Sequence, residues 1–64
     1  MFRIKELREE KGISQIQLAK AIGLDQRTIS NYEVGRREPS IEILKKLCEF
    51  FDVSAGYLIG IEKD

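Results

Sequence analysis

The chain has 64 residues, with 11 Lys and Arg against 11 Asp and Glu, one cysteine and no histidine. We expect a single domain over residues 1–64. The sequence lacks the run of about 18 apolar residues that a membrane span needs. The lack of histidine and the lone Cys48 exclude an ordinary zinc site, an internal disulfide and imidazole-based catalysis, so we predict no metal, no cofactor and no enzyme activity. The lone cysteine also favours a cytoplasmic location.

Short helices are predicted throughout, because no segment alternates apolar and polar residues as a strand does. The first should cover about residues 2–11, with Ile4 and Leu7 facing inward. The second opens at Ser14, where Ser14 and Gln17 fit a capping box. Its inward positions are Leu18, Ala19 and Ile22, and Gly23 ends the helix.

The third helix should cover residues 26–33, with Asp25 as its N-cap. Ile29 and Tyr32 form its apolar stripe. Two short helices joined by so few residues must cross steeply, and the small Ala19 permits a close crossing. We therefore expect a helix-turn-helix unit at about residues 14–33, with one side of the third helix left outside.

The last two helices should begin at Ser40 and Ser54, each serving as an N-cap. We expect Gly35 to close the third helix in the left-handed conformation. The predicted inward positions of the fourth helix recur at helical spacing: Ile41, Leu44, Leu47, Cys48 and Phe51. Cys48 is interpreted as a small core residue, and Tyr57 and Leu58 belong to the short fifth helix.

The outward side of the third helix carries amide, guanidinium and hydroxyl groups without a carboxylate between Gln26 and Tyr32. Arg donates to guanine, Gln and Asn pair with adenine, and the Thr methyl meets the thymine methyl. The charge is mildly polarised, since residues 1–39 carry eight basic against six acidic side chains and residues 40–64 three against five. This surface therefore fits DNA, although such a polar face can also be ordinary solvated surface.

The sequence resembles the phage-repressor/Cro family of helix-turn-helix DNA-binding domains, also called the xenobiotic-response-element (XRE) family. The resemblance covers Ile4 to Leu58 and implies an all-α, lambda-repressor-like bundle of five short helices. It is carried by these residues: Ile13-Ser14-Gln15, Leu18-Ala19, Ile22-Gly23-Leu24, Thr28-Ile29-Ser30, Glu33, Gly35, Pro39-Ser40, Val53-Ser54 and Tyr57-Leu58.

The resemblance implies a role for several residues in double-stranded DNA binding. The third helix would enter the major groove and read bases through Gln26, Arg27, Thr28 and Asn31. Phosphates would be contacted by Gln15, Ser30, Arg36 and Arg37, and a phosphate contact in place of a base contact is the alternative for Asn31. The family often pairs an arginine of the first helix with the glutamate ending the third, which implies a structural ion pair between Arg8 and Glu33.

We expect a transcriptional regulator, acting as a repressor on a palindromic operator. Because one domain of zero net charge makes few phosphate contacts, a homodimer is expected. Its candidate surface contains the apolar residues off the main inward stripe: Phe50, Tyr57, Ile59 and Ile61. Alternatives are the antitoxin of a toxin–antitoxin pair, the DNA-binding fragment of a longer regulator, or a helical protein-interaction module that does not bind DNA.

Overall fold

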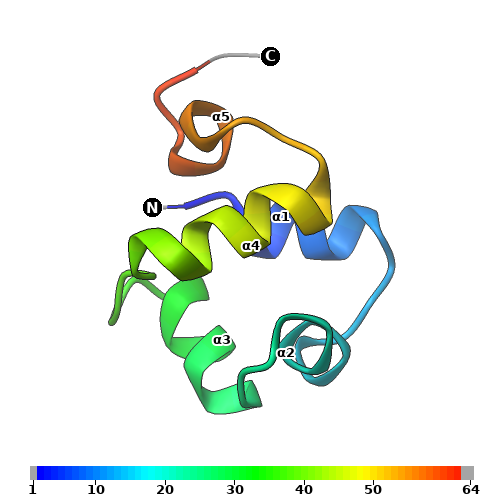
Figure 1. The fold of residues 1–64 in the computed structure, drawn as a ribbon. Helices are drawn as coiled ribbons and strands as arrows, with labels where there is room; N and C mark the ends of the chain where they lie inside the picture. The colour runs from blue at the N-terminus through cyan, green and yellow to red at the C-terminus, as the bar shows by residue number, and fades with distance from the viewer. Residues whose placement is uncertain (1, 63–64) are drawn as a thin grey trace.

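Five helices make up the fold in the computed structural model, which describes residues 2–62 (Figure 1). Helices and turns account for the described residues, without a strand, so the all-α prediction is confirmed. In chain order the helices are α1 (Ile4–Glu10), α2 (Gln15–Ile22), α3 (Gln26–Glu33), α4 (Ile41–Phe51) and α5 (Ala55–Ile59). In Figure 1, α4 crosses the middle of the molecule in front of α1, with α2 and α3 below it and α5 above.

Side-chain caps begin four of the five helices. Ser14, Asp25, Ser40 and Ser54 each accept a hydrogen bond from the backbone amide three residues on. These caps confirm the predicted starts of α2 to α5, because an extended cap residue satisfies one of the free amides of the first turn. The capping box of Ser14 with Gln17 is also present.

Helix α1 is shorter than the predicted 2–11. Its N-cap, Arg3, makes no capping side-chain bond. Instead the Arg3 backbone amide donates to the carbonyl of Leu58, 2.8 Å away. The Arg3 guanidinium also donates from Nε to the carbonyl of Tyr57 at 2.9 Å and from Nη2 to that of Glu62 at 3.1 Å. The start of the chain is thus tied to α5 and the segment after it.

One hydrophobic core lies between the helices. It is made of Ile4, Leu7, Leu18, Ala19, Ile22, Ile29, Tyr32, Leu47, Phe51 and Leu58. Leu44 and Cys48 pack against this core while remaining half-buried, and burial raises the pKa of the Cys48 thiol. The prediction was wrong for Ile41, which is 73% exposed. Helical spacing gives the face of α4 that points inward, but Ile41 lies in its first turn and borders an open groove with Leu44 and Ala55.

The α2–α3 pair is the helix-turn-helix expected at about residues 14–33. The two helices pack against each other, α2 also packs on α4, and α1 packs on α3. Gly23 adopts the left-handed conformation with φ of 77°, and the Leu24 amide returns to the carbonyl of Ala19 at 2.8 Å. This closes α2 and turns the chain sharply into Asp25. None of the helices within residues 2–62 combines the length and the apolar character that crossing a membrane requires.

Candidate nucleic-acid interface

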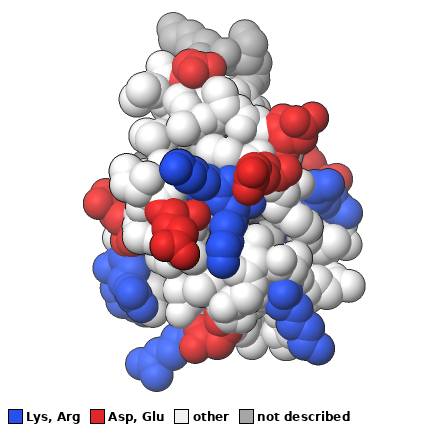
Figure 2. All heavy atoms as spheres, in the orientation of Figure 1, with Lys and Arg blue, Asp and Glu red and all other residues white. Residues whose placement is uncertain are grey.

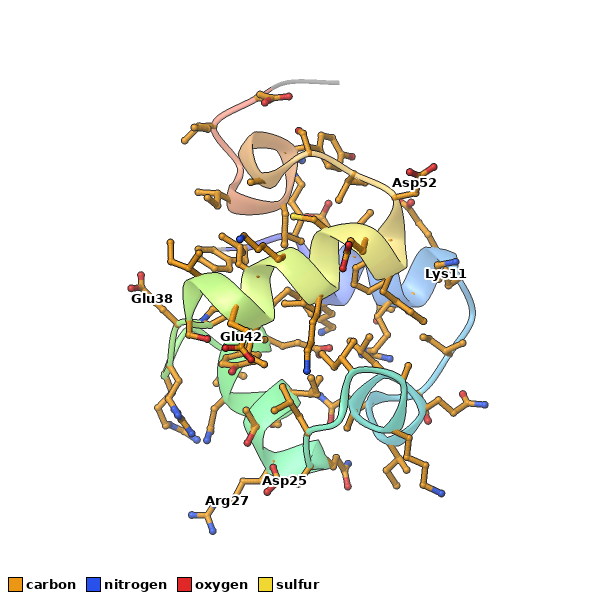
Figure 3. All side chains as sticks on the ribbon, viewed as in Figure 1. Lys11, Asp25, Arg27, Glu38, Glu42 and Asp52 are labelled. Atoms are coloured by element: carbon orange, nitrogen blue, oxygen red, sulfur yellow. The ribbon has the colours of Figure 1, made fainter. Side chains whose placement is uncertain are left out.

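The N-terminal end of α3 lies at the lower edge of the molecule, where Arg27 extends away from the body and Asp25 lies at the start of the helix (Figure 3). One oxygen of Asp25, Oδ1, accepts from the Thr28 amide at 2.8 Å and from the Thr28 hydroxyl at 2.7 Å. These two hydrogen bonds lower the pKa of the Asp25 carboxyl, and the charges of Arg27 and Arg37 lower it further. The start of α3 is therefore capped by the Asp25 carboxylate.

The outward side of α3 is open to solvent. Gln26 and Arg27 are exposed, and Thr28, Ser30 and Asn31 are half-buried. On the opposite side Ile29 is completely buried and Tyr32 is 5% exposed. Because the Thr28 hydroxyl is bonded to Asp25, this side chain uses its polar group internally. The structure therefore gathers the polar groups of the third helix on one accessible surface.

Gln15, at the start of α2, lies between the two halves of the helix-turn-helix. Its Nε2 donates to Glu33 Oε1 at 3.0 Å, and its Oε1 accepts from Gln26 Nε2 at 3.3 Å. Both ends of the Gln15 amide are engaged, so this side chain links Glu33 at the end of α3 to Gln26 at its start. Local sequence patterns carry no signal for this contact, because 18 residues separate Gln15 from Glu33.

The loop after α3 is folded back onto the helix through Asn31. The backbone amides of Arg36 and Arg37 donate to the Asn31 carbonyl at 2.9 and 3.3 Å. Arg36 Nη1 also donates to the Asn31 side-chain oxygen at 3.0 Å. Asn31, for which base contacts were expected, is thus tied to an expected phosphate-binding residue, and sequence reasoning missed this bond.

Arg8 and Glu33, expected to form a structural ion pair, are in contact beneath this surface. Arg8 Nε lies 2.6 Å from Glu33 Oε2, and their side chains are 13% and 4% exposed. Arg8 Nη1 also donates to the carbonyl of Ile13 at 2.9 Å. The hydrogen bond to Glu33 raises the pKa of the Arg8 guanidinium. This cluster joins α1, the segment before α2, and the end of α3.

The four dimer candidates do not share one environment. The Phe50 ring packs edge-on against Phe51, with centroids 5.1 Å apart, and Tyr57 lies 4.5 Å beneath the Arg3 guanidinium. Both rings are half-buried, as is Ile59. Ile61, in contrast, is 79% exposed. Ile61 is therefore the candidate with the most apolar surface open to a partner.

Charge on the visible face is mixed rather than concentrated (Figure 2). Basic side chains extend around the lower rim, where α2 and α3 lie, and acidic side chains are more frequent higher up. Within residues 2–62, the His, Cys, Asp and Glu side chains do not gather in threes that could hold a metal ion. The chemistry available at the lower end is hydrogen bonding by amides and guanidinium groups.

A model of the helix-turn-helix family matches residues 4–58, which include all five helices except Ile59. The chain belongs to the helix-turn-helix family.

Two helix-turn-helix relatives are transcriptional regulators of Bacillus subtilis (strain 168). AnsR is 39% identical over 61 residues, covering 95% of this chain and 53% of AnsR. ImmR is 36% identical over 58 residues, covering 91% of this chain and 46% of ImmR. The chain thus spans about half the length of these curated relatives.

A solved structure of the P22 c2 repressor, in complex with a synthetic operator, has the same arrangement of helices. Its TM-score is 0.87 at 32% identity, with 94% of this chain and 91% of that chain covered. The expected lambda-repressor-like fold of the helix-turn-helix domain is confirmed by this match.

Proposed function

We propose that this helix-turn-helix chain binds double-stranded DNA sequence-specifically and acts as a transcriptional repressor. The observation that carries the proposal is the accessible polar side of α3, whose opposite side is anchored in the core by Ile29 and Tyr32. An α-helix held in this way can enter the major groove, where each base pair presents a distinct pattern of donors and acceptors. The similarity to the P22 c2 repressor and to transcriptional regulators supports it.

Base reading is assigned to the first turn of α3. Gln26 and Arg27 are exposed there and carry groups that pair with adenine and guanine. The hydroxyl of Thr28 is bonded to Asp25, so the methyl group of Thr28 is its contribution to a thymine contact. Gln26 Nε2 also donates to Gln15 Oε1 at 3.3 Å, which places the Gln26 amide beside the start of α2.

Phosphate binding is assigned to residues before and after the first turn of α3. Gln15 is the first residue of α2, where free backbone amides favour an anion. Arg36 and Arg37 are exposed in the loop after α3, and Ser30 is half-buried on α3. Contacts of this kind fix the position of the protein on the duplex and carry no sequence information of their own.

The proposal includes a homodimer on a palindromic operator. The net charge is zero, so a single domain would bind DNA weakly, with a Kd of roughly 10⁻⁴–10⁻⁶ M. Half-sites of a palindrome lie about 34 Å apart on one face of the duplex. The backbone measures 28 × 23 × 19 Å, which allows two neighbouring copies at that spacing. We assign the contact between copies to the surface around Phe50, Tyr57, Ile59 and Ile61.

Under this proposal the chain acts by binding and not by catalysis. Its location would be the cytoplasm, because bacteria, the source of the relatives named above, keep their DNA in that compartment.

Selection of bound sequences from a random duplex library tests the proposal. We expect a palindromic consensus for the parent protein. Gln26→Ala and Arg27→Ala should each relax one or two positions in each half-site, at a cost of about 1–3 kcal/mol. Lys5→Ala, an exposed change on α1, is the matched control and should leave the consensus unchanged. Failure of the parent to enrich any sequence would favour a protein-interaction module and overturn the proposal.

Analytical sedimentation tests the homodimer separately. The parent should show concentration-dependent association, and Ile61→Glu should weaken it, because a charge would replace an exposed apolar side chain. The fold should survive this change, since Ile61 lies outside the core. A parent protein that stays monomeric to high micromolar concentration would contradict the dimer.

A further inference from the structure

From the bond between Asn31 and Arg36 we infer that Asn31 is a positioning residue, which holds the Arg36 guanidinium toward a DNA phosphate and does not read a base. The phosphate contact rests on the proposed function. The orientation of Arg36 by Asn31 is a property of the protein alone.

The contact joins α3 to the loop at three points. The Asn31 carbonyl accepts from the backbone amides of Arg36 and Arg37, at 2.9 and 3.3 Å, and its side-chain oxygen accepts from Arg36 Nη1 at 3.0 Å. The main-chain bonds set the turn, and the side-chain bond sets the guanidinium. Asn31 is half-buried on α3, whereas the Arg36 side chain that it contacts is exposed.

An amide is suited to this role because it orients the arginine without neutralising it. Guanidinium has five N–H donors, and the bond to Asn31 uses one of them. The remaining donors and the whole positive charge stay available for a phosphate. Arg8 shows the contrast, since its charge is matched by the carboxylate of Glu33 at 2.6 Å and serves the interior.

The same bond argues against Asn31 as a reader of adenine. Pairing with adenine requires the amide oxygen and the amide nitrogen to face the base edge together. In the structure the oxygen faces the loop and accepts from Arg36. Turning the amide to a base would therefore release Arg36 from its position.

A double-mutant cycle measures the coupling. We expect Asn31→Ala and Arg36→Ala each to weaken operator binding, by about tenfold for loss of a hydrogen bond to a charged group. The double variant should bind no more weakly than Arg36→Ala, because Asn31 acts through Arg36. The matched cycle uses Arg37→Ala, since the Arg37 side chain makes no hydrogen bond with Asn31 in the described part of the chain. In this second cycle the two losses should multiply.

Sequence selection separates positioning from base reading. Asn31→Ala should leave the selected consensus unchanged, as Arg36→Ala should, while both reduce the salt dependence of binding. A consensus relaxed at one position by Asn31→Ala, but not by Arg36→Ala, would overturn the inference. Independent, multiplicative losses in the Asn31–Arg36 cycle would overturn it too.

Side-chain NMR of the free protein tests the orientation without DNA. The order parameter of the Arg36 Nε–H group should fall in Asn31→Ala, with that of Arg37 unchanged. Asn31→Asp should keep Arg36 ordered, since it retains the acceptor, and yet weaken DNA binding, because its carboxylate cancels the charge. An Arg36 side chain that is equally ordered with and without the Asn31 amide contradicts the positioning role. Absence of DNA binding by the folded parent would overturn the proposed function, and the NMR result would still decide whether Asn31 positions Arg36.

Discussion

Arg8 and Glu33 form a two-pronged contact across 25 residues of sequence. Arg8 Nε donates to Glu33 Oε2 at 2.6 Å, and Arg8 Nη2 donates to Glu33 Oε1 at 3.2 Å. The Glu33 side chain is 4% exposed, so its carboxylate depends on protein groups for hydrogen bonds. Such a fork has a fixed geometry, which ties the direction of α3 to α1.

Replacing Arg8 should therefore cost more stability than replacing a neighbouring surface lysine. Arg8→Ala leaves the Glu33 carboxylate buried, with the Gln15 amide as its remaining partner among residues 2–62; losing one member of a fully buried pair costs on the order of 3–5 kcal/mol. Lys5→Ala removes an exposed charge on the same helix and serves as the control. Thermal unfolding followed by circular dichroism measures both, and equal melting temperatures would refute a supporting role for Arg8.

Gln15→Glu should destabilise the protein, whereas Gln17→Glu should not. The first change places a second carboxylate where the Gln15 amide now donates to Glu33 Oε1 at 3.0 Å, so like charges would repel. The second change places a carboxylate in the same first turn of α2, where it can keep the capping-box bond that Gln17 already makes to the Ser14 amide and interacts favourably with the helix dipole. Denaturant unfolding at neutral pH compares the two variants. A similar stability for both would mean that Gln15 does not contact Glu33 in solution.

The cap of α3 should lose its advantage in acid. Hydrogen bonds from Thr28 lower the pKa of Asp25 in the folded protein relative to the unfolded chain. The folded state then binds this proton less tightly, so the stabilisation is complete above the unfolded value of about 3.9 and is lost as the pH falls through the folded pKa. Asp25→Ser provides a cap that does not titrate.

Urea unfolding from neutral to strongly acidic pH would show this difference. The stability gap between the parent and Asp25→Ser should stay constant above about pH 5 and change in favour of the serine variant below about pH 4. A gap that is independent of pH throughout would exclude a charged cap.

At backbone positions in the left-handed conformation, removing a Cβ atom should raise stability and adding one should lower it. Asp52 has φ of 56° at the end of α4, so Asp52→Gly should raise the free energy of unfolding by about 0.5–1 kcal/mol. Gly23 has φ of 77°, and a Cβ added there meets no atom within 4 Å. Gly23→Ala should therefore lower stability by about 1 kcal/mol through backbone strain alone. Melting temperatures that move in the same direction would contradict this account.

Helix boundaries were the most predictable part of the fold, because caps are local. Ser14, Asp25, Ser40 and Ser54 each carry an oxygen that reaches an amide three residues away, and the glycine turn at Gly23 is equally local. The prediction that Ile41 faces the core was wrong because burial, unlike a cap, depends on neighbouring helices. Periodicity identifies the inward face of a helix but not how far the neighbouring helices extend along it.

At the candidate site, the sequence predicted the outward polar face of α3 but not the hydrogen bonds of the Gln15 and Asn31 side chains. An outward polar face on α3 follows from the spacing of Ile29 and Tyr32. The orientation of the Gln15 and Asn31 amides depends on partners brought close by tertiary packing and by the turn after α3. A glutamine or asparagine side chain has several rotamers of similar energy, so sequence spacing cannot choose among them.

The hydrogen bond between the Arg3 amide and the Leu58 carbonyl, at 2.8 Å, brings the two ends of the described chain together. α5 lies above α4, at the end of the molecule remote from the first turn of α3 (Figure 1). A short peptide linker could therefore close the polypeptide into a ring without crossing the polar side of α3. Such a ring would restrict the unfolded chain and raise the melting temperature of a very small protein.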